Sequence, residues 1–220
     1  MTSNSIPKHS FELLFASLIA VILLPPIFTL QGGMLVKITL TLVLISSLYL
    51  VTEKKTALFF GSFLALATIL TAWSEGLFHI PNRSIILTII YLVFFSYISV
   101  FLFAFIVNCK TASSDIIFSA MCLYIFIANI WMFIYALIFL IKPESFSLSQ
   151  HIDINPESDF HTVLNTFSYY SFVTITSVGY GDIVPTNPVA RAWVSVEAVI
   201  GQLYLAVILA KLVGLTANKK

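Results

Sequence analysis

The chain has 220 residues, of which 59% are hydrophobic and 10% are charged, and its formal net charge at pH 7 is +1. Soluble domains average about 25% charged residues, so this composition excludes an ordinary soluble domain and indicates an integral membrane protein. The small net charge gives no reason to expect a nucleic-acid partner. Cys109 and Cys122 lack disulfide or zinc spacing, and we interpret them as small apolar residues of membrane helices.

Six apolar segments are each long enough to form a helix across a bilayer core about 30 Å thick. The first, residues 11–30, has a signal peptide as its competing interpretation because Lys8 precedes it, but no small-residue cleavage site follows. The remaining segments are residues 34–51, 57–73, 84–107, 116–141 and 190–215. The composition therefore predicts an all-α membrane protein with six transmembrane helices in a lipid bilayer.

The stretch between the last two apolar segments has a different composition. Residues 143–160 are polar and contain several acids, which suits a solvated turret outside the membrane. Residues 161–174 are too short to span a bilayer and too aromatic for a loop. They are expected to form a re-entrant helix, which a membrane tolerates when protein surrounds it.

A glycine-containing segment follows this short helix: Ser177-Val178-Gly179-Tyr180-Gly181. Gly179 and Gly181 permit left-handed backbone angles, which allow successive carbonyls to point toward one axis. A ring of such carbonyls replaces the hydration shell of K⁺. Tyr180 is expected to wedge outward and hold the ring open, and the Ser177 hydroxyl to add a further ligand.

Residues 177–182 resemble the TVGYGD signature of tetrameric pore-loop potassium channels, with Ser177 where Thr is usual. The resemblance extends over residues 164–214, where Pro185, Arg191 and Gly201 match family positions, and it is weak to absent before residue 115. It implies a homotetramer that conducts K⁺ and needs no cofactor. The implied filter is Thr176, Ser177, Val178, Gly179, Tyr180, Gly181 and Asp182, with K⁺ held at Ser177, Val178, Gly179 and Tyr180.

The pore helix is expected to support the filter through Tyr169, Tyr170 and Thr174. Relatives that place Glu on this helix pair it with the acid after the filter. Val173 stands at that position here, so Tyr169 or Tyr170 must brace the filter instead. Asp182 either concentrates cations and caps the filter, or it is a plain loop acid.

The last helix carries the candidate residues for gating and for the cavity. Glu197 either hydrogen-bonds behind the filter, pairs with Arg191, or is an interfacial acid, since an acid within a membrane helix is costly. Gly201 matches the hinge glycine of the family, although close helix packing explains it equally well. Four further residues fall near one helical face and are expected to line the cavity: Gln202, Leu205, Leu209 and Val213.

The fourth helix has no basic residue between Ile85 and Asn108, whereas voltage sensors carry Arg or Lys at regular intervals there. We therefore expect two regions: residues 1–114, a four-helix membrane region without voltage-sensor charges, and residues 115–220, a pore domain. The pore domain is expected to comprise a helix at 115–142, a turret at 143–160, the pore helix and filter at 161–182, and an inner helix at 190–215.

Filters of this family open outward, which places both termini in the cytoplasm of a plasma-membrane protein. This orientation leaves seven basic residues inside and four outside, in the sense of the positive-inside rule. The sequence predicts a passive, K⁺-selective channel that is not strongly voltage-gated. It predicts no enzymatic activity, because no nucleophile arrangement or His/Cys/Asp cluster occurs outside the pore. The alternatives are a membrane subunit of a potassium transporter and a weakly selective cation channel.

Overall fold

The computed structural model describes residues 10–27, 32–51, 55–74, 81–109, 113–152, 154–155 and 160–217. Its α-helices, in chain order, are α1 (Ser10–Ile27), α2 (Gly32–Leu48), α3 (Lys55–Trp73), α4 (Arg83–Asn108), α5 (Ser114–Ile141), α6 (Phe160–Ile175) and α7 (Pro188–Ala217). Two 3₁₀ turns and two short strands complete the described elements: η2 (Tyr49–Val51), η3 (Pro143–Ser145), β1 (Phe146–Leu148) and β2 (Ile183–Pro185). The protein is therefore helical, as expected, apart from one small ladder of strands.

Four of the described helices, α3, α4, α5 and α7, are long and apolar enough to cross a membrane. The apolar parts of α1 and α2 are shorter, Ser10–Leu24 and Met34–Leu48, whereas a spanning helix needs about 20 apolar residues. The described residues thus contain four candidate membrane spans, and the six-helix layout expected from the sequence stays a prediction. Helices α1 and α2 cover fewer residues than the first two predicted segments. Residues 28–31 lie outside the described residues, and the end of the second segment forms the 3₁₀ turn η2.

Large apolar side chains cover the outside of the bundle. Phe59 and Phe63 of α3 are 69% and 62% exposed, and Val100 of α4 is 65% exposed. A surface of this kind is unfavourable against water and suited to lipid tails. The arrangement identifies a membrane protein.

The interior of the bundle is built around the contact between α4 and α5, which is rich in aromatic rings. The Tyr91 ring stacks on Phe133 with centroids 5.3 Å apart, and Phe95 contacts both Phe126 at 4.8 Å and Phe133 at 5.2 Å. All four side chains are at most 2% exposed. Buried aromatic pairs of this kind stabilise the contact beyond the area they bury, so α5 is a firm support for the helices that follow it.

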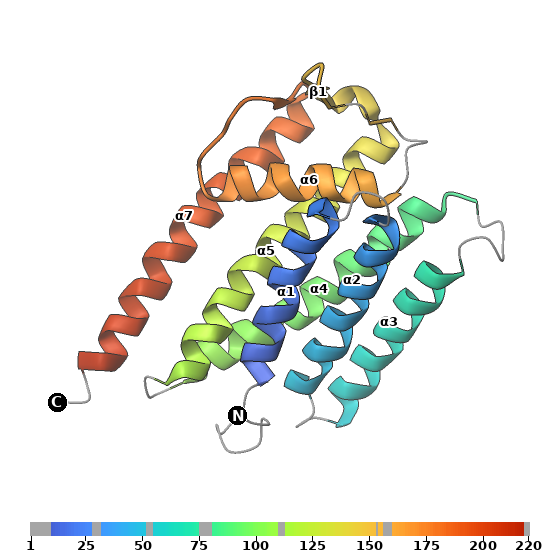
Figure 1. Ribbon diagram of the computed structural model, residues 1–220. Helices are drawn as coiled ribbons and strands as arrows, with labels where there is room; N and C mark the ends of the chain where they lie inside the picture. Colours follow the sequence, from blue (N-terminus) through green and yellow to red (C-terminus); the bar gives the residue numbers. More distant parts are fainter. Residues whose placement is uncertain are drawn as a thin grey trace.

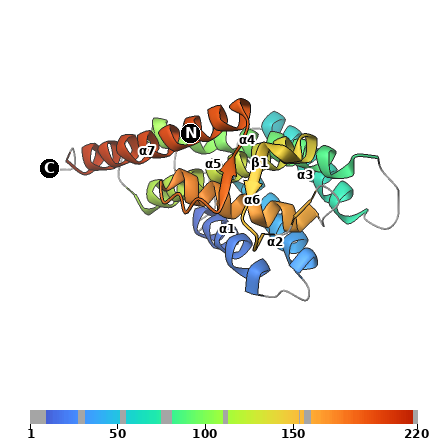
Figure 2. The ribbon, with the colours of Figure 1, turned by 90° about the horizontal axis from the view of Figure 1, so that it is seen from above.

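Helix α6 lies across one end of the bundle, whereas its neighbours run along the length of the molecule (Figure 1). It packs mainly against α5 and also contacts α1 and α2. Helix α7 leans away from the bundle toward its C-terminal end, as the view from above also shows (Figure 2). It contacts α5, α6 and β2, and several of its apolar side chains are open, including Leu203, Val207 and Val213 at 59–66% exposed.

Part of the stretch expected to be a solvated turret is packed instead. Ser145 is fully buried and Phe146 is 5% exposed, because β1 pairs antiparallel with β2, with Phe146 opposite Pro185 and Leu148 opposite Ile183. A polar composition alone does not reveal such a pairing. The turret acids Asp153, Glu157 and Asp159 lie outside the described residues, as do five of the basic residues used for orientation, namely Lys8, Lys54, Lys110, Lys219 and Lys220.

Candidate functional site

The segment between α6 and β2 has an alternating backbone. Ser177, Gly179 and Gly181 have φ angles of 61°, 57° and 80°, all left-handed, while Val178 and Tyr180 between them do not. Side chains and carbonyls of an extended strand alternate between its two sides. A left-handed residue at every second position instead turns alternate peptide planes, which brings successive carbonyls toward one side. This geometry suits a carbonyl-lined cation site.

Ser177 shares the left-handed conformation although it is not glycine, which the sequence did not indicate. A non-glycine residue costs about 1–2 kcal/mol in this conformation. Two hydrogen bonds offset the cost: Ser177 N–H donates to Thr174 O at 2.9 Å, and Gln202 Nε2 donates to Ser177 Oγ at 2.8 Å. Gln202, expected only to line the cavity, therefore contacts the innermost residue of the segment.

The inner end of the segment is tied to the last turn of α6. The N–H groups of Val178 and Gly179 both donate to Val173 O, at 2.9 Å and 3.2 Å. The Thr176 hydroxyl donates to Phe172 O at 2.6 Å. Because α6 ends one residue before Thr176, the position of this helix determines where the carbonyls lie.

At the outer end, Tyr169 and Asp182 hold the segment together. The Tyr169 hydroxyl donates to Asp182 Oδ2 at 2.6 Å, and the Tyr169 ring stacks on the Tyr180 ring, with centroids 6.5 Å apart and planes 3° apart. Asp182 Oδ1 accepts the Ile183 N–H at 3.1 Å. Of the two tyrosines expected to brace this region, Tyr169 is thus the one that contacts it directly.

Tyr170 belongs instead to a buried aromatic cluster formed by α5, α6 and β1. Its ring lies 5.2 Å from Tyr135 and 5.7 Å from Phe146. Phe167 joins the same cluster 5.0 Å from Phe146. Since these rings are at most 5% exposed, they form a rigid wall that supports α6.

Glu197 is the one acid of α7, and it is fully buried. Its Oε1 lies 2.5 Å from Ser171 Oγ of α6, and its Oε2 accepts a hydrogen bond from the Tyr135 hydroxyl of α5 at 2.5 Å. Arg191 does not take part, because its Nε donates to Pro185 O at 3.2 Å. The structure thus places Glu197 behind the segment, which is one of the three interpretations that the sequence left open.

Tyr135 and Ser171 are functional candidates that sequence reasoning missed. Each is one of several polar side chains in its helix, and Tyr135 lies 62 residues from its partner in the chain. Nothing local marks them. The only signal was Glu197 itself, since a buried acid requires polar partners.

Gly201 sits where α7 meets the end of α6. A Cβ atom at this residue would lie 2.4 Å from Ile175 O and 2.7 Å from Ile175 Cγ1. The same carbonyl accepts a hydrogen bond from the Tyr124 hydroxyl at 3.2 Å. The structure therefore supports the packing interpretation of Gly201, because a side chain at this position would collide with the end of α6. A hinge would not require such a close contact.

The other residues expected to line the cavity are open in the single chain. Leu205 and Leu209 are 41% and 61% exposed. They follow Gln202 along α7.

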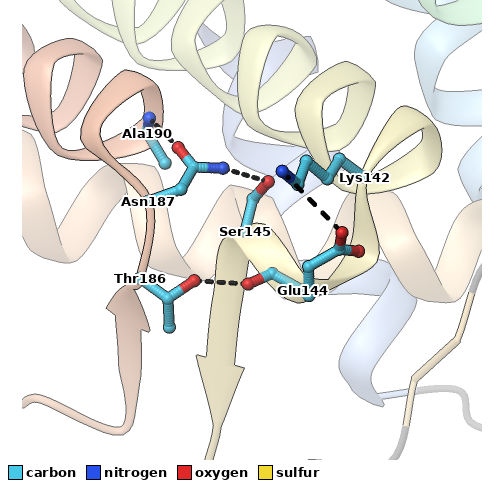
Figure 3. A network of polar contacts seen from close by, with 6 residues as sticks. All are labelled: Lys142, Glu144, Ser145, Thr186, Asn187 and Ala190. Carbon is cyan, nitrogen blue, oxygen red and sulfur yellow. Dashed lines mark hydrogen bonds and ion pairs between the residues drawn. The ribbon is translucent and has the colours of Figure 1, made fainter.

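A polar network fastens the chain after the segment to the chain before α6 (Figure 3). Asn187 Nδ2 donates to the buried Ser145 Oγ at 2.5 Å, and the Thr186 hydroxyl donates to Glu144 O. Asn187 Oδ1 also accepts the Ala190 N–H at 2.8 Å, so this residue caps α7 at its N-terminus. The Lys142–Glu144 ion pair at 3.9 Å is exposed and adds little. Together with the β1–β2 ladder, the network fixes the outer end of the segment.

The protein is an apolar helical bundle with one crosswise helix, followed by a segment whose alternating backbone turns its carbonyls toward one side. These features define a membrane protein of the ion channel class. In agreement, a family model described as an ion channel matches residues 84–218, more than half of the chain. The chain belongs to this ion channel family, which is not a class of enzymes. No curated protein and no solved structure matches the chain.

Proposed function

We propose that this protein is a potassium-selective channel that passes K⁺ passively through backbone carbonyls of residues 177–180. The observation that carries the proposal is the left-handed backbone at every second residue, 177, 179 and 181. Carbonyls directed to one side replace the water of a dehydrated cation. Asp182 adds negative charge beside the outer end, where it attracts cations. No bound cofactor is needed for this function.

A closed ring of carbonyls requires several copies of the chain around one axis, because each chain contributes a single row. The exposure of the conducting elements supports such an assembly: Val178 and Tyr180 are 53% and 72% exposed, and Val207 of α7 is 62% exposed. The resemblance to tetrameric pore-loop channels sets the number at four. The proposed protein is a homotetramer in the plasma membrane with cytoplasmic termini.

In this assembly α6 acts as a re-entrant pore helix. The C-terminal end of a helix carries a partial negative charge of about half an elementary charge. Directed at the axis, the C-terminal ends of four copies of α6 stabilise a cation in the central cavity without any fixed charge. Leu205 and Leu209 then provide an apolar cavity wall in which the ion is not held tightly.

Strong voltage gating is not part of the proposal, because α4 lacks the charges for it. Its basic residue is Arg83, at the first position of the helix. Arg83 Nη2 donates to Thr71 O at 2.6 Å and to Ala72 O at 3.0 Å, so it caps the C-terminal end of α3. A side chain held in this way is a structural contact and not a mobile gating charge.

Cation flux into liposomes that contain the purified protein tests the proposal. K⁺ and Rb⁺ should enter far faster than Na⁺, and Ba²⁺ should block entry. Gly179→Ala should abolish the flux, because a methyl group opposes the left-handed angle. Gly214→Ala is the matched control, since it adds the same methyl group at a position of α7 with nothing within 4 Å.

Native mass spectrometry should show a tetramer for the wild type and for both variants. Equal K⁺ and Na⁺ flux would favour the weakly selective cation channel. A tetramer without flux, or a stable monomer, would favour a subunit of a potassium transporter.

A further inference from the structure

Three helices meet at the buried carboxyl group of Glu197. Tyr135 of α5 and Ser171 of α6 contact its two oxygens, each at 2.5 Å. The Ser171 hydroxyl also lies 2.7 Å from the carbonyl oxygen of Ala128 on α5. Glu197, Tyr135 and Ser171 are all fully buried, so bulk solvent does not reach the network. We refer to these three side chains as the carboxyl cluster.

Counting hydrogens in the carboxyl cluster indicates its protonation state. The three contacts, Tyr135 to Glu197, Ser171 to Glu197 and Ser171 to Ala128 O, each require one hydrogen. A tyrosine and a serine hydroxyl supply two, and an amide carbonyl supplies none. With an ionised Glu197, one contact would bring two oxygens together with no hydrogen between them. With a protonated Glu197, its O–H donates to Ser171 Oγ, Ser171 donates to Ala128 O, and all three bonds form.

The charges around the cluster agree with this count. The other titratable groups that interact with Glu197 from its neighbours are phenols, Tyr124 on α5 and Tyr170 on α6. On α7 itself, Arg191 binds Pro185 O instead. An ionised carboxylate buried without a cation is strongly unfavourable, whereas a neutral, fully hydrogen-bonded acid is not. The hydrogen count and the lack of a cation beside Glu197 among the described residues therefore point the same way.

We propose that Glu197 is a neutral, protonated positioning residue that holds α6 against α5 and α7. Ser171 lies two residues before Val173, whose carbonyl binds the N–H groups of Val178 and Gly179. Loss of the proton puts a charge into the cluster and removes one of its three hydrogen bonds, so α6 and the carbonyls that follow it lose their fixed position. The protonation state stands on the geometry alone, while its effect on K⁺ flux rests on the proposed channel function.

Infrared difference spectroscopy tests the protonation without any need for conduction. The spectrum of the wild type minus that of Glu197→Gln, in liposomes at pH 7, should contain the C=O stretch of a neutral carboxylic acid. A carboxylate band in its place overturns the proposal. Glu197→Gln is informative because its amide N–H donates to Ser171 and its oxygen accepts from Tyr135, which reproduces the protonated acid and not the ionised one.

Flux measurements test the positioning role. Glu197→Gln should conduct K⁺ like the wild type, whereas Tyr135→Phe should lower the flux about tenfold, since it leaves a buried acceptor unpaired. Raising the pH should lower the flux of the wild type but not that of Glu197→Gln. Identical pH profiles, or loss of flux in Glu197→Gln, overturn the positioning role. If the wild type shows the carboxylic acid band but passes no K⁺, the protonated cluster is supported and the channel function is refuted. The two proposals can therefore fail independently.

Discussion

Adding one methyl group at Gly201 should disturb the contact between α7 and the end of α6. The Cβ atom of Gly201→Ala would lie 2.4 Å from Ile175 O, 2.7 Å from Ile175 Cγ1 and 3.2 Å from Ile175 C. Two of these three atoms are backbone atoms, which do not move aside as the tip of a flexible side chain does. Since Ile175 O also accepts the Tyr124 hydroxyl, α7 must shift by about 1 Å to reach ordinary contact distances.

The size of the effect follows from two opposing contributions. Overpacking a well-packed interior costs about 1–3 kcal/mol, while alanine is more favourable than glycine within a helix by about 1 kcal/mol. Gly214→Ala has the second contribution without the first, because nothing lies within 4 Å of its Cβ position. Gly201→Ala should therefore be less stable than Gly214→Ala by about 1–3 kcal/mol.

The free energy of unfolding, measured by denaturant titration in detergent micelles, checks this difference. K⁺ flux should fall in Gly201→Ala as well, because α6 ends at Ile175, next to the first filter residue. If Gly201→Ala matches Gly214→Ala in both stability and flux, the two helices do not meet as closely as described, and the packing interpretation of Gly201 is wrong.

Three further outcomes are expected. Tyr169→Phe removes the hydrogen bond to Asp182, worth about 0.5–1.5 kcal/mol, and should lower the ratio of K⁺ to Na⁺ flux; an unchanged ratio would show that ring stacking alone braces the filter. Gln202→Leu leaves the Ser177 hydroxyl without its donor and should weaken block by internal Ba²⁺, which single-channel dwell times measure. Arg83 caps α3, and no other basic residue lies on α4. Open probability should therefore change gently with voltage over about ±100 mV, since one full gating charge would contribute about 2.3 kcal/mol per 100 mV. A steep activation curve that survives a change of permeant ion would refute this.

The membrane class and the left-handed glycines were predictable from the sequence because both depend on local properties. An apolar composition with few charges excludes water as the surrounding solvent wherever the helices lie. Gly179 and Gly181 adopt the left-handed angles expected for them, since the freedom of a glycine is a property of that residue alone. The scarcity of charge on the fourth helix is likewise visible without coordinates.

Other features were decided by residues that are distant in the chain. The burial of Ser145 and Phe146 depends on strand β2, some forty residues further on, and a polar stretch does not reveal its partner. The left-handed Ser177 is stabilised by Gln202, 25 residues away.

The sequence by itself determined that Glu197 is a costly residue and that Gly201 has a special role, but it left several roles open for each. Only the tertiary structure brought Tyr135 and Ser171, 62 and 26 residues away, onto the carboxyl group, and placed Ile175 O against Gly201. The physical reason is that the sequence shows a requirement but not how it is met. A buried acid requires hydrogen-bond partners, and a glycine at a close helix contact leaves space for the neighbouring backbone. Which groups satisfy that requirement depends on how α5, α6 and α7 pack.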